Sequence, residues 1–134
     1  LGQLASRPIW IDGAHNAHGA DALTAALPVI DDRGWHFICG ALATRPADEF
    51  LQRIAPLAAS ITCITIPDQP ASLPAGELAN AARKSFPAAR IASSVSGALQ
   101  ALADDPDDSG LPIMICGSLY LAGHVLVENG SLPD

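Results

Sequence analysis

The sequence predicts an α/β fold, in which an open and mostly parallel sheet of five to six strands has helices on both faces. Strand-like apolar runs alternate with helical patterns five times along the 134 residues, as in consecutive βαβ units. Hydrophobic residues make up 49% of the chain and aromatic residues only 4%, so small aliphatic side chains fill the core. No internal repeat or linker divides the chain, so we expect one domain over residues 1–134 with a Rossmann-like arrangement.

Short β-prone runs bounded by turn residues predict the strands. The clearest run is Ser60–Ile66, which is rich in β-branched residues. The three prolines of Pro67–Pro74 predict a loop directly after it. The predicted strands are Pro8–Asp12, Trp35–Cys39, Ser60–Ile66, Arg90–Ser93 and Pro112–Cys116.

Apolar residues three or four positions apart predict the helices between these strands. Leu23, Leu27 and Ile30 share one side of the first helix, which we expect over Gly19–Leu27. The last three helices are expected over Pro74–Lys84, around Val95, Leu99 and Leu102, and up to a C-cap near Asn129–Gly130.

The second helix has its own start signal. Thr44 can cap it, and a first turn that holds Pro46, Asp48 and Glu49 suits the positive end of the helix dipole. Its inward side is predicted to consist of Phe50, Ile54 and Leu57.

The charge pattern excludes some classes of partner. The formal net charge is −7, and the seven Lys and Arg form no basic stripe, so we expect no nucleic-acid partner. The acids of Asp104–Asp108 fit a solvated loop. No apolar stretch is long enough to cross a membrane and no signal peptide is present, so we expect no membrane partner.

The cysteines indicate a reducing compartment. Cys39, Cys63 and Cys116 lie in separate apolar runs without Cys-x-x-Cys spacing, which predicts buried, reduced thiols and a cytoplasmic protein. The chain begins at Leu1 without methionine, which predicts that it is a segment of a longer protein.

Three strand-to-helix junctions are rich in glycine and polar residues: 12–19, 40–45 and 117–120. Ligands of open parallel sheets bind beyond the carboxyl ends of the strands, where these junctions lie. Glycine permits close backbone approach, and helix N-termini offer free N–H groups to anions. The junctions therefore form the candidate binding site.

The polar residues of these junctions have both functional and structural interpretations. Asp12 can accept hydrogen bonds from a ribose diol or can cap a turn, and His15 can bind a charged substrate. Arg45 can pair with a carboxylate or phosphate or can be a solvated loop residue. Ser118 can bind a ligand or can cap the last helix.

The sequence predicts no metal site and no phosphate-binding loop of its own. His15 and His18 lie three apart, but no third ligand has matching spacing. The GxxxxGK[ST], GxGxxG and GxSxG patterns are absent from the sequence, which argues against a Walker-type loop, dinucleotide binding and an α/β-hydrolase.

Two long motifs resemble those of folylpolyglutamate and dihydrofolate synthases, in the Mur ligase superfamily. Ile11–Asn16 (IDGAHN) resembles the DGAHNP signature that opens their C-terminal domain, and Gly117–Gly123 (GSLYLAG) resembles the segment after its final strand. Gly40–Pro46 (GALATRP) resembles the family's GxLxxKD loop. The departures are Ala17 for proline, Arg45 for lysine and Pro46 for the acid, and an arginine presents its charge in a different geometry from a lysine.

The resemblance implies the C-terminal domain of an ATP-dependent ligase that adds L-glutamate to folate or dihydropteroate through an acyl phosphate. ATP and Mg²⁺ would bind mainly to an N-terminal P-loop ATPase domain, which is absent from these residues and would be the chain's partner in a monomeric enzyme. This domain would close the cleft, and alone it would be inactive. The implied residues are His15 and Asp12 for catalysis, Ser118, His15 and Arg45 for substrate, and Asp12 and Asn16 for nucleotide.

Two other functions are compatible with the same residues. The chain could be a freestanding Rossmann-like module that binds a small anionic metabolite without catalysis. It could also belong to a related ligase for cell-wall peptides, but the pair His15–Asn16 and the tripeptide Leu119–Leu121 fit the folate branch better.

Overall fold

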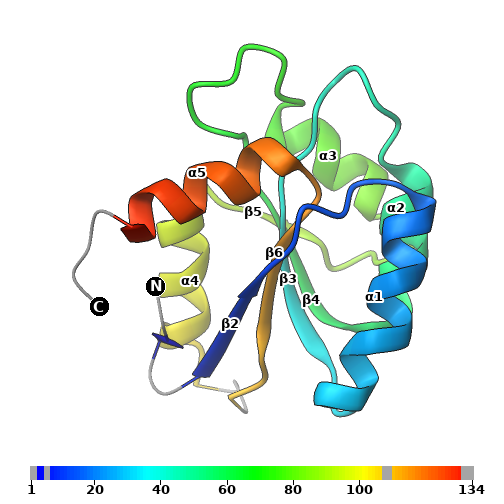
Figure 1. Ribbon diagram of the computed structural model, residues 1–134, viewed down its shortest axis with the longest axis vertical. Helices are drawn as coiled ribbons and strands as arrows, with labels where there is room; N and C mark the ends of the chain where they lie inside the picture. The colour runs from blue at the N-terminus through cyan, green and yellow to red at the C-terminus, as the bar shows by residue number, and fades with distance from the viewer. Residues whose placement is uncertain (1–2, 5–6, 107–109, 131–134) are drawn as a thin grey trace.

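A computed structural model describes residues 3–4, 7–106 and 110–130 of the chain (Figure 1). Within these ranges, one sheet of six strands has the order β1-β2-β6-β3-β4-β5. Among the described strands, β2, β6, β3, β4 and β5 are parallel to their neighbours in this series, and β1 is antiparallel to β2. The strands are β1 (Gln3–Leu4), β2 (Arg7–Ile11), β3 (Trp35–Cys39), β4 (Ala58–Cys63), β5 (Arg90–Ile91) and β6 (Ile113–Cys116).

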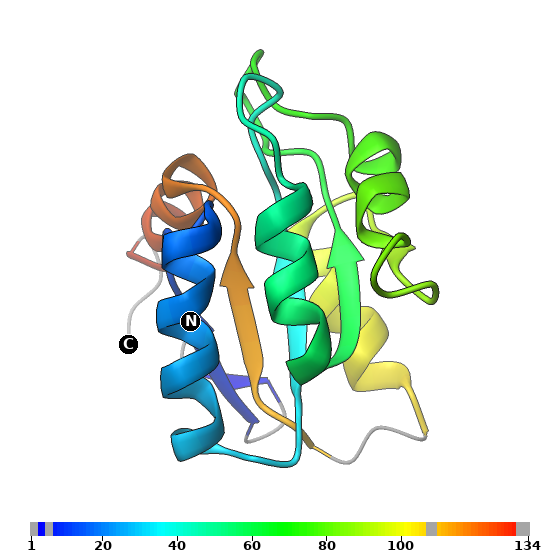
Figure 2. The same ribbon diagram turned by 90° about the vertical axis from the view of Figure 1, so that its right-hand side faces the viewer.

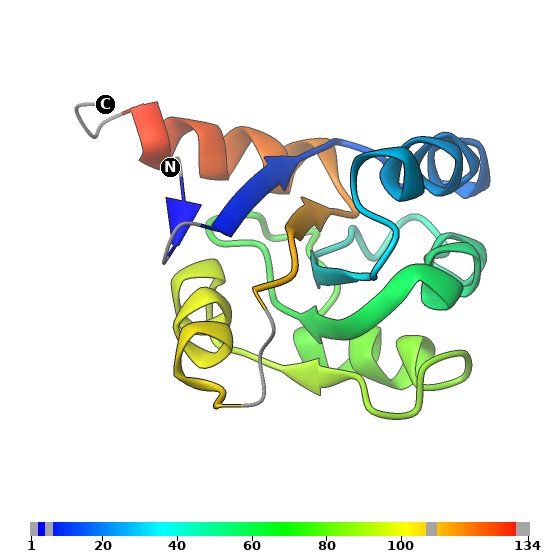
Figure 3. The same ribbon diagram turned by 90° about the horizontal axis from the view of Figure 1, so that it is seen from below.

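Helices cover both faces of this sheet (Figure 3). One core packs three helices against one face, with Leu27 and Phe50 among its buried residues, and these helices include α1 and α2 side by side (Figure 2). The other core packs two helices against the opposite face, with Leu102 and Val125 buried there. The helices are α1 (Ala17–Ile30), α2 (Asp48–Ile54), α3 (Ala75–Ala82), α4 (Val95–Asp104) and α5 (Leu119–Gly130), and a short 3₁₀ helix spans Ala55–Leu57.

The sheet confirms the predicted fold class and most strand positions. β3 has the predicted bounds, and all five of its residues are buried, which explains why four of them are apolar. β4 begins two residues earlier than predicted and ends at Cys63, because Ile64–Ile66 leave the sheet. β5 keeps only Arg90–Ile91 of its predicted run, and the antiparallel β1 was not predicted.

Two helix predictions need correction. Thr44 does not cap the second helix, because α2 begins at Asp48 with Ala47 in the N-cap position and without a side-chain cap. The first helix extends beyond its predicted ends, since Asn16 caps it at its start. Leu23 and Leu27 of the predicted apolar side are buried, whereas Ile30 at its end is 48% exposed.

The inward side of α2 is confirmed in part. Phe50 and Ile54 are buried, together with the unpredicted Leu51, whereas Leu57 is only partly buried in the 3₁₀ helix that follows. Asp107 and Asp108 of the predicted solvated loop lie outside the described residues. No helix in the described part of the chain is long and apolar enough to cross a membrane.

Candidate functional site

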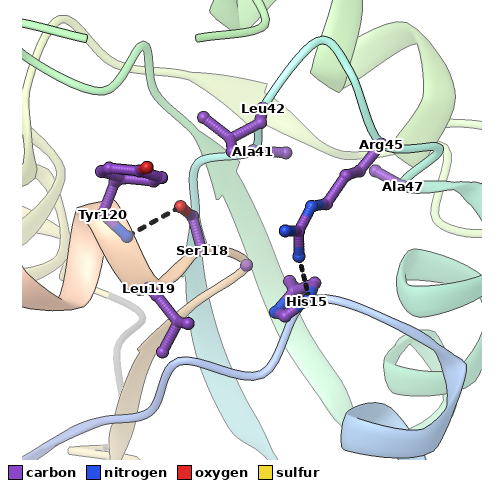
Figure 4. Close-up of a pocket in the computed structure, with 9 residues that line it drawn as sticks. His15, Ala41, Leu42, Arg45, Ala47, Ser118, Leu119 and Tyr120 are labelled. Carbon is purple, nitrogen blue, oxygen red and sulfur yellow. Dashed lines mark hydrogen bonds between the residues drawn. The ribbon is translucent and has the colours of Figure 1, made fainter. Parts of the chain in front are cut away.

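The strand order brings the three predicted junctions together. β6 lies between β2 and β3, so the carboxyl ends of these strands are neighbours at one edge of the sheet. A pocket of about 350 Å³, counting space open to solvent, lies among the segments that follow them (Figure 4). Its lining residues are His15, Ala41, Leu42, Arg45, Ala47, Gly117, Ser118, Leu119 and Tyr120.

His15 and Arg45 contact each other across the pocket. His15 Nδ1 lies 3.1 Å from the carbonyl oxygen of Gly13, and because a carbonyl oxygen only accepts, the Nδ1–H donates this hydrogen bond. His15 Nε2 can then accept the hydrogen bond from the Arg45 guanidinium (Figure 4). The contact joins the junction after β2 to the junction after β3, so Arg45 is directed at the pocket and not only toward solvent.

Ser118 is the buried polar group of the pocket, with 3% of its surface exposed. Its Oγ accepts a hydrogen bond of 3.0 Å from the Tyr120 backbone N–H at the start of α5. The Ser118 oxygen therefore caps the start of α5, as the structural interpretation expects. The hydroxyl can still donate its proton to a ligand in the pocket.

Asp12 and Asn16 organise the loop beside the pocket. Asp12 Oδ1 accepts a hydrogen bond of 2.8 Å from the Ala14 N–H, as the turn-cap interpretation expects. Asn16 Oδ1 accepts one of 2.8 Å from the Gly19 N–H and caps α1. Asp12 is exposed, and among the described residues its Oδ2 has no hydrogen-bond partner, so this oxygen can accept from a ligand.

Two thiols lie beneath the pocket at the ends of β3 and β6. Cys39 Sγ is 4.0 Å from Cys116 Sγ, and both side chains are buried. The hydrogen bond with Cys116, and then burial, raise the pKa of the Cys39 thiol well above its usual range. This thiol therefore stays protonated. Because only a thiolate is a nucleophile, we assign Cys39 a role in core packing and not in catalysis.

Sequence reasoning missed several parts of the pocket. Its apolar residues, such as Leu42 and Leu119, belong to the predicted junctions but were not named as site residues. Their positions shortly after a glycine of each junction could have identified them. Residues 71–73, which belong to the loop predicted over Pro67–Pro74, pair with the segment that carries Arg45. In the described ranges, no group of three His, Cys, Asp or Glu side chains is placed to hold a metal ion.

Comparison with known proteins confirms the resemblance stated above. The family model described as the C-terminal domain of dihydrofolate synthetase matches residues 3–128. A folylpolyglutamate synthase of Lacticaseibacillus casei is 32% identical over 117 residues, which cover 87% of this chain and 26% of that protein.

Solved structures are similar over nearly the whole chain. Folylpolyglutamate synthase of Mycobacterium tuberculosis, complexed with ADP, has a TM-score of 0.79 and 28% identity, covering 94% of this chain and 30% of that one. A bifunctional folylpolyglutamate synthase/dihydrofolate synthase with Mn, AMPPNP and L-glutamate bound has a TM-score of 0.74 and 23% identity, covering 96% and 31%. The chain thus spans less than a third of the length of these relatives, and it belongs to the family of dihydrofolate synthetase C-terminal domains.

Proposed function

We propose that the chain is the C-terminal domain of an ATP-dependent ligase that joins L-glutamate to folate or dihydropteroate. The observation that carries this proposal is the convergence of the family's three motif segments on one pocket, where a guanidinium, an imidazole and a buried hydroxyl face the same space. The relatives named as folylpolyglutamate synthases, one of them solved with L-glutamate bound, support glutamate as the ligand of this pocket.

The chemistry of the pocket suits an amino acid with carboxylate groups. Arg45 offers a fork of N–H donors, and the N-terminus of α5 offers the positive end of a helix dipole. The Ser118 hydroxyl adds a neutral donor at the same end of α5. Leu42 and Leu119 supply an apolar wall for the aliphatic part of the ligand.

The reaction proceeds through an acyl phosphate. Transfer of the terminal phosphoryl group of ATP to the acceptor carboxylate makes an acyl phosphate and ADP. The glutamate amine then attacks the acyl carbon, the bond from carbon to the phosphate oxygen breaks, and the nitrogen loses a proton. His15 Nε2 is the proposed acceptor of that proton, because a carboxylate that engages Arg45 releases this nitrogen.

Asp12 and Asn16 serve the nucleotide side of the site. The Oδ2 atom of Asp12 would accept from the ribose hydroxyls while Oδ1 keeps the turn in place. Asn16 fixes the loop through its cap on α1. No group of three His, Cys, Asp or Glu side chains among the described residues is placed to hold Mg²⁺, so we assign Mg²⁺ and the ATP phosphates to the N-terminal domain.

The proposed partner of this domain is the N-terminal ATPase domain of the same polypeptide, in a monomeric enzyme. An acyl phosphate is lost to hydrolysis unless water is excluded, and a closing second domain provides that exclusion. Three buried, free thiols fit a cytoplasmic enzyme. The isolated domain is expected to be inactive, since the acyl phosphate is made elsewhere.

The test is a ligation assay on the complete enzyme with ATP, L-glutamate and either dihydropteroate or a reduced folate, with the product identified by mass spectrometry. We expect the acceptor to gain one glutamate only when ATP is present, and we expect no such product from the 134-residue chain alone. Absence of any glutamylated product with both acceptors would overturn the proposal. Turnover by the chain alone would contradict a site shared with the N-terminal domain. Binding of glutamate without any ligation would favour the freestanding module that binds a small anionic metabolite.

A further inference from the structure

Two loops extend together beyond the carboxyl ends of the strands (Figure 1, Figure 2). One is the segment after β3, and the other is the segment 64–74 after β4. An antiparallel bridge joins Leu42 to Ser72. The Ala43 N–H donates to the Ala71 carbonyl at 2.7 Å, and the Leu73 N–H donates to the Ala41 carbonyl at 2.8 Å. We call residues 41–43 and 71–73 the loop pair.

The hydroxyl of Ser72 is the centre of this loop pair. Its Oγ accepts a hydrogen bond of 2.9 Å from the Ile66 N–H and donates one of 3.1 Å to the Leu73 carbonyl. The Ser72 N–H also donates to the Gln69 carbonyl at 3.0 Å. One partly buried side chain thus ties together both ends of the segment 66–73, which contains no helix or strand to hold it.

The loop pair supports the turn that carries Arg45. The Arg45 N–H donates to the Leu42 carbonyl at 3.2 Å, so this turn begins at the residue that bridges to Ser72. Arg45 itself is exposed, and the described hydrogen bond of its guanidinium is the one to His15. A long, exposed side chain can be directed at a ligand only if its backbone is held, and here the holding contacts come from the segment after β4.

We propose that Ser72 is a positioning residue, which sets the affinity of the pocket for the carboxylate ligand by holding the turn that carries Arg45. This inference rests on the proposed glutamate site. Ser72 does not line the pocket, so its effect reaches the ligand only through the backbone of the loop pair and Arg45. This role of Ser72 makes the segment after β4 a fourth part of the binding site, beside the three junctions.

A merely structural role for Ser72 would produce a different result. Loss of its hydrogen bonds would then lower the stability of the domain without a selective effect on one substrate. Ser94 provides the matched control, because its Oγ also accepts a backbone N–H at 2.9 Å, from Gly97, but caps α4, which contributes no residue to the pocket. Ser72→Ala and Ser94→Ala should therefore cause similar losses of thermal stability.

The experiment is steady-state kinetics of the complete enzyme with glutamate and ATP varied in turn. Ser72→Ala should raise the KM for L-glutamate by about fivefold or more, while kcat and the KM for ATP stay within about twofold. Ser72→Thr, which keeps the hydroxyl, should restore the wild-type KM, and Ser94→Ala should leave it unchanged. Equal glutamate KM values for Ser72→Ala and Ser94→Ala would overturn the inference.

A double-mutant cycle shows whether the effect passes through Arg45. Arg45→Ala should raise the glutamate KM, and Ser72→Ala should add almost nothing in the Arg45→Ala background. Full additivity would sink the inference, whereas an Arg45→Ala enzyme with normal glutamate KM would instead sink the proposed glutamate site. If Ser72→Ala does not fold, Ala43→Pro removes the N–H that donates to Ala71 and should raise the same KM.

Discussion

Gly117 lies so close to Gly40 that a Cβ atom on Gly117 would be 2.5 Å from the Gly40 carbonyl oxygen. The backbone of Gly117 also has a φ of +106°, in the region that disfavours residues with a side chain. Its N–H donates to the Ala14 carbonyl at 2.8 Å, which connects the junction after β6 to the junction after β2. This single glycine therefore holds all three junctions of the pocket together.

Gly117→Ala should destabilise the chain strongly. The positive φ costs about 1–2 kcal/mol for an alanine, and the contact with the Gly40 carbonyl forces a further shift, so the loss should exceed about 2 kcal/mol. Urea unfolding followed by circular dichroism measures it. Gly123→Ala is the control, because its Cβ would meet nothing within 4 Å and alanine favours a helix. A Gly117→Ala domain as stable as Gly123→Ala would contradict the close packing described here.

Much of the fold follows from the sequence because burial on both faces leaves a clear pattern. All five residues of β3 are buried, and four of them are apolar (His36 is the exception), so this run predicted the bounds of the strand. The junction residues were also predictable, because a glycine-rich segment after a strand has few structural reasons to be so polar. The carboxyl ends of the parallel strands predicted the site, and the family resemblance assigned His15 and Ser118 to it; both residues line the pocket.

Other features depend on contacts that no local pattern encodes. Thr44 is a good capping residue, yet α2 begins at Asp48 because the turn before it is tied to the loop pair. The exposed Ile30 satisfies helical spacing but lies in the last turn, past the edge of the core. The role of Ser72 arises from pairing between loops that are thirty residues apart in sequence (Leu42 and Ser72), and this pairing follows from strand order rather than composition.

Asp12→Asn should weaken nucleotide binding without disturbing the turn. The amide oxygen can still accept the Ala14 N–H, but the negative charge offered to the ribose is lost. In the complete enzyme we expect the KM for ATP to rise about tenfold, equivalent to roughly 1.4 kcal/mol, with the glutamate KM little changed. Asp21→Asn, an exposed carboxylate on α1 bonded to Arg53, is the control. An unchanged ATP KM in Asp12→Asn would refute the ribose assignment.

Stability should fall at alkaline pH because of Cys63. Burial and the neighbouring Cys39 raise the pKa of the Cys63 thiol from 9.0 to about 12. Between these pH values the unfolded chain releases a proton that the folded chain keeps. The contribution of the Cys63 thiol to the free energy of unfolding is therefore complete below pH 9.0 and is lost as the pH rises toward 12.

The slope of the unfolding free energy against pH measures this contribution of Cys63. Unfolding free energies between about pH 9.5 and 10.5 should fall less steeply in Cys63→Ala than in the wild-type chain, by about 1 kcal/mol per pH unit. Ser94→Ala, which removes a helix cap and no titratable group, should keep the wild-type slope. Identical slopes for Cys63→Ala and the wild type would show that the thiol does not titrate as described.

The proposed glutamate site depends most directly on His15, which faces the pocket and contacts Arg45. The decisive measurement is kcat/KM for L-glutamate in ATP-dependent ligation by the complete enzyme, for His15→Ala against His18→Ala. His18 is an exposed histidine three residues away that does not line the pocket. We predict that His15→Ala loses at least about 100-fold in kcat/KM, whereas His18→Ala stays within about twofold of wild type. A His15→Ala enzyme that retains its fold and a near-normal kcat/KM for glutamate would contradict the claim that this pocket is the glutamate site.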